Sequence, residues 1–279
     1  MQINKNLILT RENNKPILID TFYSEDYDQQ PIAIFCHGYK GYKDWGAWNL
    51  MAKAIANAGI CVVKFNFSHN GGTIEQPIDF PDLEAFGQNN YTKELDDLND
   101  VIDWVSRQFN DLSYIDISNI GLIGHSRGSG IAILKAAEDK RIKKLISLAG
   151  VSDFEMRFGS EEEIRTWKAS GVKFIVNGRT KQQMPHYYQF YEDFLRNRQR
   201  LNIQRATRHM DIPHLIIHGD KDNTVKIEEA QSVHKWNPKS ELFIVENADH
   251  VFNTKQPWTN EDVSPELNLA IAKMSSFLK

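Results

Sequence analysis

The chain has 279 residues, of which 41% are hydrophobic and 25% charged, a composition typical of a globular protein and long enough for one large α/β domain. Its net charge of −4 excludes the basic footprint of a nucleic-acid-binding protein. No window approaches the roughly 20 apolar residues of a membrane span, and the opening MQINKNLILTRENN lacks the apolar core of a secretory signal. We therefore expect a cytoplasmic protein without nucleic-acid or membrane partners.

Apolar runs alternate with amphipathic stretches along the first half of the chain, which predicts βα units on a mostly parallel sheet. An antiparallel hairpin is expected first, over 7–10 and 17–22. Further strands are expected at 32–36, 60–67, 120–123 and 144–148, helices at 48–58, 91–109 and 128–137, and a long loop at 68–90. Loops of that length are often functional.

The two cysteines, Cys36 and Cys61, both lie in expected strands. Buried, reduced thiols in a reducing cytoplasm are the expectation, and a disulfide would require the two strands to be neighbours. The sequence contains no CxxC pair and no His/Cys cluster at zinc spacing, so we predict no metal site.

The second half returns to the same alternation after an interruption. Strands are expected at 214–217 and 242–245 around a helix at 227–235, and a closing helix at 265–278. Residues 152–210 lack this rhythm, so we expect a core of 1–151 and 211–279 with 152–210 inserted in the same domain. This partly helical, aromatic-rich insertion fits a lid over a pocket. The alternatives are a helical excursion packed on its own aromatic core, and a surface for contact between two copies of the chain; the oligomeric state stays open.

The strongest chemical motif is Gly124-His125-Ser126-Arg127-Gly128, a GxSxG between an expected strand and an expected helix. A serine on such a sharp turn holds its hydroxyl above the sheet, and the helix N-terminus offers N–H groups to a developing oxyanion. The motif predicts Ser126 as a nucleophile. The alternative is a turn serine that caps the helix.

A serine nucleophile needs a base oriented by a carboxylate, in the chain order Ser, Asp or Glu, His. Asp222 follows the strand at 214–217, and His250 follows the strand at 242–245, where ligands bind in open α/β sheets. We predict Asp222 as the acid and His250 as the base. Asp220 and Asp153 are the competing acids, and His218 is the competing base.

The expected strand at 32–36 runs into His37-Gly38-Tyr39-Lys40-Gly41, at the place where this kind of site has its oxyanion loop. We predict the backbone N–H groups of Tyr39 and Arg127 as the oxyanion donors. The phenol of Tyr39 either lines the pocket or packs in the protein.

Four segments in order, HGYKG, GHSRGSG, HGDKDNTV and NADHVF, resemble the α/β-hydrolase superfamily. Their spacing is similar to the bacterial esterases and dienelactone-hydrolase-like proteins, including the cinnamoyl (feruloyl) esterases, from about Ile32 to the end. The resemblance implies the α/β-hydrolase fold with helices on both faces of the sheet, and an insertion at 152–210 that shapes the substrate pocket. It also implies Ser126, Asp222 and His250 as the triad, with the Tyr39 and Arg127 amides as the oxyanion hole.

Two departures from the resemblance limit the activity. True dienelactone hydrolases use a cysteine nucleophile, and the related oligopeptidases carry a β-propeller for which these residues have no room. The expected function is a serine esterase that cleaves a small or aryl ester through an acyl-enzyme and requires no cofactor. The alternatives are a thioesterase, acyltransferase, lipase-like enzyme or small peptidase on the same triad, and a binding protein that kept the fold without turnover.

Overall fold

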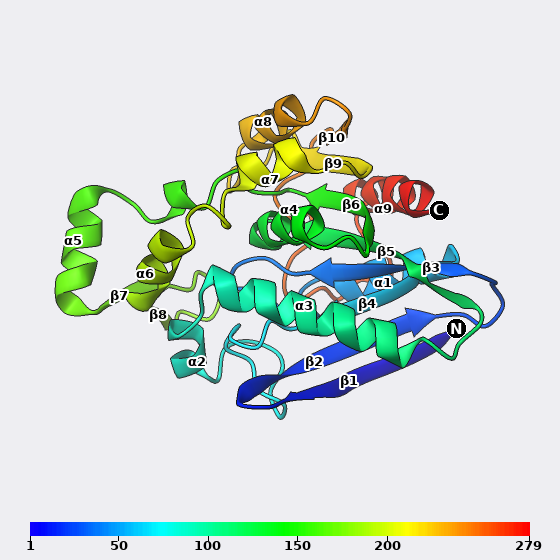
Figure 1. Cartoon of the computed structure of the whole chain (residues 1–279), viewed down its shortest axis with the longest axis horizontal. Coiled ribbons are helices and arrows are strands. Elements are labelled where there is room, and N and C mark those ends of the chain that lie inside the picture. Colours follow the sequence, from blue (N-terminus) through cyan, green and yellow to red (C-terminus); the bar gives the residue numbers. More distant parts are fainter.

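The computed structural model describes residues 1–279 and places them around an eight-stranded sheet in the order β1-β2-β4-β3-β5-β6-β9-β10 (Figure 1). β2 pairs antiparallel with β1 and β4, and all other neighbouring strands are parallel. The mostly parallel sheet predicted from the sequence is confirmed. The strands are β1 (Gln2–Arg11), β2 (Asn14–Tyr23), β3 (Gln30–Cys36), β4 (Cys61–Phe65), β5 (Ile115–His125), β6 (Ile142–Leu148), β9 (His214–Gly219) and β10 (Glu241–Val245).

Helices cover both faces of this sheet. One face carries α1 (Trp48–Asn57) and α9 (Pro265–Leu278), and the other carries α3 (Tyr91–Gln108), α4 (Arg127–Glu138) and α8 (Ile227–Trp236). Successive β3 residues alternate between the two layers: Ile34 packs in the cluster with α3 and α4, and Phe35 in the cluster with α1 and α9. Burial on both faces explains the continuous apolar runs that predicted these strands.

Local sequence signals set the helix ends. The Asn90 side chain accepts a hydrogen bond from the Lys93 N–H (2.8 Å) where α3 begins. Ser264 accepts one from the Leu267 N–H (3.1 Å) at the start of α9, directly before Pro265. Both residues satisfy an N–H that would otherwise lack a partner, which is why these two helices begin at the predicted positions.

The segment between β6 and β9 is the predicted insertion, and it contains a hairpin that the sequence did not predict. Its elements are the 3₁₀ helix η1 (Glu155–Arg157), α5 (Glu161–Ser170), β7 (Val172–Val176), β8 (Gln183–Tyr187), α6 (Gln189–Arg196) and α7 (Ile203–His209). Figure 1 shows α5, β7, β8 and α6 together beyond one end of the main sheet. The β7–β8 hairpin is hidden in the sequence because the apolar residues Phe174, Ile175 and Val176 are exposed, so buried and exposed positions do not alternate.

The insertion packs on a second irregular region, the expected loop at 68–90. That region is not wholly loop, because it contains α2 (Leu83–Gly87), whose first turn is capped by the Asp82 side chain. Phe80 and Phe86 of this region bury Met184 of β8 in a small apolar cluster. The two segments, about 100 residues apart in sequence, therefore form one wall beside the sheet.

The two cysteines are free and buried on neighbouring strands, β3 and β4. Cys61 is paired in register with Ile32, four residues before Cys36, and this separation amounts to about 13 Å at the rise of a strand. A disulfide is excluded at that distance. None of the helices combines the length and the apolar character needed to cross a bilayer.

Candidate active site

Ser126 occupies a strained turn between β5 and α4. Its backbone lies at φ 55° and ψ −119°, a region that residues with a side chain rarely adopt. A Cβ on Gly124 would come within 2.4 Å of the Ser129 Cα, and one on Gly128 within 2.4 Å of the Cys36 carbonyl oxygen. The two glycines of the motif are therefore required so that the helix can pack directly beside the strand ends, and this packing holds the serine in its turn.

His250 lies between Ser126 and Asp222, within hydrogen-bonding distance of both. Its Nδ1 is 2.7 Å from Asp222 Oδ2, and its Nε2 is 3.0 Å from Ser126 Oγ. In the neutral imidazole that carries its proton on Nδ1, the ring donates to the carboxylate and accepts from the serine hydroxyl. This is the geometry in which a histidine can remove the serine proton.

The Asp222 carboxylate is held in its charged form. Its Oδ1 accepts hydrogen bonds from the Thr224 and Val225 amides, at 2.8 and 2.9 Å. Burial raises the pKa of this carboxyl, but hydrogen bonds from His218, His250 and the Val225 amide lower it by more, so the pKa lies well below its usual value. An ionised Asp222 fixes the orientation of His250 and stabilises an imidazolium when one forms.

The competing residues from the sequence do not meet Ser126. Asp220 accepts a hydrogen bond from the Asn247 amide (2.6 Å), and Asp153 accepts one from the Met156 amide (3.2 Å), so both carboxylates stabilise loops. His218 Nε2 donates to the Val225 carbonyl (2.8 Å) and lies 3.4 Å from Asp222 Oδ2. His218 therefore lies beside the carboxylate oxygen that also faces His250, and it does not contact Ser126.

The loop after β3 lies directly against the nucleophile turn. A Cβ on Gly38 would be only 2.9 Å from the Ser126 Cβ, so only glycine allows this approach. The N–H of Tyr39 donates to no group in the protein, and the N–H of Arg127, at the first position of α4, has no partner within the helix. Tyr39 and Arg127 therefore each carry an amide without a protein acceptor, and both residues line one cavity with Ser126.

A buried group of charged side chains, Asp20, Lys43 and Lys64, contacts the loop that follows β3. The Lys64 ammonium donates to the Lys43 carbonyl (2.6 Å) and to Asn49 Oδ1 (2.8 Å), and it lies 3.6 Å from Asp20 Oδ2. The Lys43 ammonium lies 2.8 Å from the other oxygen of Asp20. Because these side chains are fully buried, the loop position depends on their remaining together.

The Tyr39 side chain joins the oxyanion loop to the insertion. Its hydroxyl lies 2.7 Å from His186 Nε2 on β8, and its ring lies 4.2 Å below the Arg127 guanidinium. The Trp167 indole N–H donates to the His186 carbonyl (2.7 Å) and holds β8 in place. The two roles considered for this phenol are both present, because Tyr39 packs against Arg127 and also lines the cavity described next.

Four histidines, His37, His125, His186 and His214, are buried and neutral. Burial lowers the pKa of His37 to about 4 and the pKa values of the other three to about 3, since the charged imidazolium loses its hydration. Two of them support the site: His37 Nδ1–H donates to the Gly38 carbonyl (2.9 Å), and His125 Nε2–H donates to the His250 carbonyl (3.0 Å).

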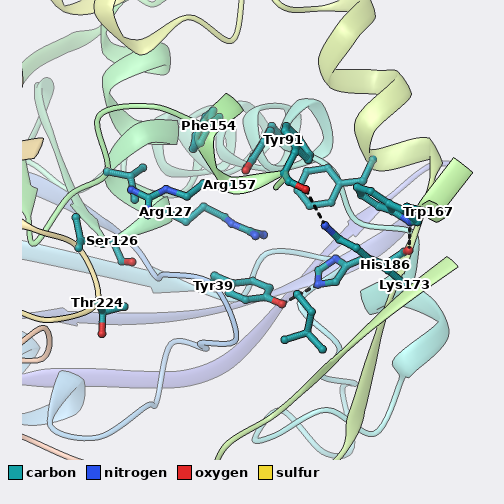
Figure 2. Close-up of a pocket in the computed structure, with 15 residues that line it drawn as sticks. Tyr39, Tyr91, Ser126, Arg127, Phe154, Arg157, Trp167, Lys173, His186 and Thr224 are labelled. Carbon is teal, nitrogen blue, oxygen red and sulfur yellow. Dashed lines mark hydrogen bonds between the residues drawn. The ribbon is translucent and has the colours of Figure 1, made fainter. Parts of the chain in front are cut away.

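A cavity of about 240 Å³ opens on one side of Ser126. Most of its walls are aromatic or aliphatic, and many come from the insertion, as Figure 2 shows. The lining residues are Tyr39, Tyr91, Ser126, Arg127, Val151, Phe154, Arg157, Phe158, Trp167, Lys173, Ile175, His186, Phe190, Thr224 and Val225. The aromatic residues of the insertion are therefore both core and pocket wall: Phe154, Phe158, Trp167 and Phe190 belong to the main core cluster and also face the cavity.

A second, wider hollow shares Tyr39 and Ser126 with this cavity and includes His250. Lys40, Arg179 and Lys255 are among its lining residues, and Arg179 forms an ion pair with Asp79. Ser126 thus lines both the aromatic cavity and the hollow that includes the candidate base.

The sequence did not point to several of these residues. Arg127 entered the prediction only as a backbone donor, yet its side chain is half-buried, stacks on Tyr39 and lies 3.4 Å from the buried Glu94 carboxylate. Lys173 and His186 gave no signal because they lie in the unpredicted hairpin. No local pattern could have found the Tyr39–His186 contact, which joins residues 147 positions apart.

Solved structures resemble this chain along its whole length. Est1E from Butyrivibrio proteoclasticus matches with a TM-score of 0.68 at 17% identity, covering 99% of this chain and 98% of that one. The structure of ferulic acid bound to Est1E matches with the same TM-score at 19% identity, over 95% and 94% of the two chains. Dienelactone hydrolase from Anabaena variabilis matches with a TM-score of 0.63 at 16% identity, over 99% and 96%. These likenesses confirm the predicted α/β-hydrolase fold.

Curated sequences match over shorter segments. The uncharacterized 31.7 kDa protein of the traX-finO intergenic region of Escherichia coli is 27% identical over 128 residues, which is 45% of this chain and 39% of the relative. The uncharacterized protein YcjY of Escherichia coli K12 is 25% identical over 155 residues, 54% of this chain and 46% of the relative. The chain thus spans less than half the length of these relatives.

The model of the prolyl oligopeptidase family matches residues 49–268, from the start of α1 into α9. That match takes in the nucleophile turn and the loops that carry Asp222 and His250. The chain therefore belongs to the prolyl oligopeptidase family and has the α/β-hydrolase fold.

Proposed function

We propose that this protein is a hydrolase that cleaves carboxylic esters through an acyl-enzyme on Ser126, with His250 as the base, Asp222 as the acid and the Tyr39 and Arg127 amides as the oxyanion hole. The observation that carries the proposal is the continuous hydrogen-bonded chain from Asp222 through His250 to Ser126, at 2.7 and 3.0 Å. The free amides beside the serine support it.

The reaction has two steps. His250 accepts the Ser126 proton as Oγ attacks the ester carbonyl, and the two amides hold the oxygen that becomes negative. His250 then gives the proton to the leaving alcohol. A water molecule enters, loses a proton to His250 and releases the acid by the same route. Asp222 stays ionised throughout, and it orients the ring and stabilises its charged form.

The two hollows take different parts of the ester. The leaving oxygen must come close to His250 Nε2, so the alcohol belongs in the hollow that includes His250. The acyl group then occupies the aromatic cavity, whose insertion-derived walls act as a cap. A volume of about 240 Å³ equals about eight water molecules in the liquid, which suits an acyl group of modest size rather than an extended peptide. The ferulic acid named with Est1E is an aryl acid of this kind, which also supports an aryl acyl group here.

A small peptidase on the same residues is the second candidate, because the family match is to the prolyl oligopeptidases. Measuring kcat/KM for the ester, the thioester and the 4-nitroanilide of one acyl group distinguishes an esterase from a thioesterase and a peptidase. We expect kcat/KM to be highest for the ester. A proline 4-nitroanilide cleaved at the rate of the best ester would instead establish the peptidase.

The nucleophile is tested by labelling with a fluorophosphonate, read by mass spectrometry, on the wild type, Ser126→Ala and the control Ser106→Ala on α3. We expect one adduct, on Ser126, present in the control and absent in Ser126→Ala, together with turnover of a 4-nitrophenyl ester. A folded wild type that gains no adduct and turns over no ester would support a binding protein instead.

A further inference from the structure

The acyl cavity has an uneven charge. Three cationic side chains, Arg127, Arg157 and Lys173, are among its lining residues, and no carboxylate is. A cavity that is otherwise mostly apolar has no need of cations for its own stability, because each one loses hydration there. Each of these cations is therefore expected to have an anionic partner, either in the protein or in a bound ligand.

Two of the three cations have that partner within the protein. Arg127 lies 3.4 Å from Glu94, and Arg157 forms an ion pair with Glu229. Lys173 forms no ion pair; its ammonium donates to the Phe158 carbonyl (3.3 Å) and lies 4.0 Å above the Trp167 ring. One positive charge of the cavity thus lacks a direct ion pair, and the carboxylate that acts on it from a longer distance, Glu163 of α5, is not among the lining residues.

The Arg127 guanidinium also has donors to spare. It carries five N–H donors, and its one hydrogen bond is the long contact to Glu94. Figure 2 shows Arg127 and Lys173 reaching toward the same part of the cavity from opposite sides, with Tyr39 and His186 below them. These positive charges also act on the neighbouring His186. Burial is the largest cause that lowers the pKa of His186, and the charges of Arg127, Lys173 and Lys40 lower it further, while no carboxylate raises it.

We propose that the cavity binds an acyl group that ends in a carboxylate, held by the Lys173 ammonium and the free donors of Arg127. The substrate would then be the half-ester of a dicarboxylic acid with an apolar or aryl body, its ester carbonyl at Ser126 and its free carboxylate at Lys173. This rests on the ester hydrolysis proposed above and names the substrate class. The aromatic walls contact the apolar body of the acyl group. The positive charges of Lys173 and Arg127 favour acyl groups with a carboxylate over neutral acyl groups of similar size.

Matched pairs of esters test the charge alone. Monomethyl terephthalate is compared with methyl 4-carbamoylbenzoate, and monomethyl adipate with methyl 6-amino-6-oxohexanoate, so that each carboxylate faces a neutral amide of nearly the same shape. We expect at least one carboxylate ester to have the higher kcat/KM, by about ten- to hundredfold, the worth of a charged hydrogen bond. Lys173→Gln should remove most of this ratio.

Lys168→Gln is the matched control, because Lys168 is an exposed lysine of α5 in the same insertion. It should leave the ratio of the two kcat/KM values at the wild-type level. If both amides are cleaved as fast as their carboxylate partners, or if Lys173→Gln leaves the ratio unchanged, the half-ester proposal is wrong while ester hydrolysis stands. Absence of both Ser126 labelling and turnover of any ester would overturn the two proposals together.

Discussion

Replacing Gly38 with alanine tests whether the close contact between Gly38 and Ser126 fixes the position of the loop that carries the Tyr39 amide. The added Cβ would lie 2.9 Å from the Ser126 Cβ and 3.1 Å from His125 Nδ1. Carbon atoms that are not bonded settle at about 3.5–4.0 Å, so the loop must move away by roughly 0.6–1.1 Å. Such a shift takes the Tyr39 N–H, on the next residue, out of hydrogen-bonding distance of the oxyanion.

The loss of one oxyanion donor lowers kcat by about 10²–10³. We expect a fall of about 100-fold for Gly38→Ala, with KM nearly unchanged, because the oxyanion exists only in the transition state. Steady-state kinetics on a 4-nitrophenyl ester measures this, and fluorophosphonate labelling should slow in parallel. Thermal unfolding shows whether the variant is folded at the assay temperature. A folded Gly38→Ala with kcat within twofold of the wild type would refute the reasoning.

Three further predictions concern the acid, the buried charges and the histidines. Asp222→Asn should lower kcat by about 10⁴, because the amide favours the wrong tautomer of His250; a fall of less than tenfold on the same ester would mean that another group orients the ring. Lys64→Met should lower the free energy of unfolding in urea by about 1–3 kcal/mol, because the buried Lys43 carbonyl loses its hydrogen-bond donor while Asp20 keeps Lys43 and Lys5 as partners; a loss below about 0.5 kcal/mol would contradict a stabilising role. His37, His125, His186 and His214 have pKa values of about 3 to 4 in the folded chain, so the unfolded chain takes up protons first as the pH falls below about 6.5. The free energy of unfolding should therefore be highest above that pH and fall below it, by about 2 kcal/mol for each of these histidines at pH 5. A free energy of unfolding in urea that does not change between about pH 6.5 and pH 5 would contradict this.

The sheet could be predicted because its strands are buried on both faces. Continuous apolar runs such as 32–36 and 214–217 have no other simple explanation, and the capped helices α3 and α9 begin where their side chains indicate. The order of the motifs also indicated which residues would meet, since Asp222 and His250 each follow a parallel strand and such strand ends share one edge of the sheet.

The pocket could not be predicted in the same way, because tertiary contacts decide it. The β7–β8 hairpin exposes apolar side chains that sequence periodicity treats as buried. The partners of Arg127 and Tyr39 lie 33 and 147 positions away along the chain, on elements that meet only after the sheet has formed. The cysteine pair shows the same limit: neighbouring strands were a condition for a disulfide, but the register, which the sequence does not contain, excludes one.

The hydrogen bond between Tyr39 and His186 has a consequence for how such an enzyme diversifies. A cap inserted between two strands is a module that evolution can exchange without rebuilding the sheet. Here the module also holds Tyr39, whose amide we propose as an oxyanion donor, so under that proposal a new cap would alter the rate of the reaction together with the choice of substrate. Lineages that change their acyl preference by replacing this segment must therefore recover a partner for the tyrosine or accept a slower enzyme.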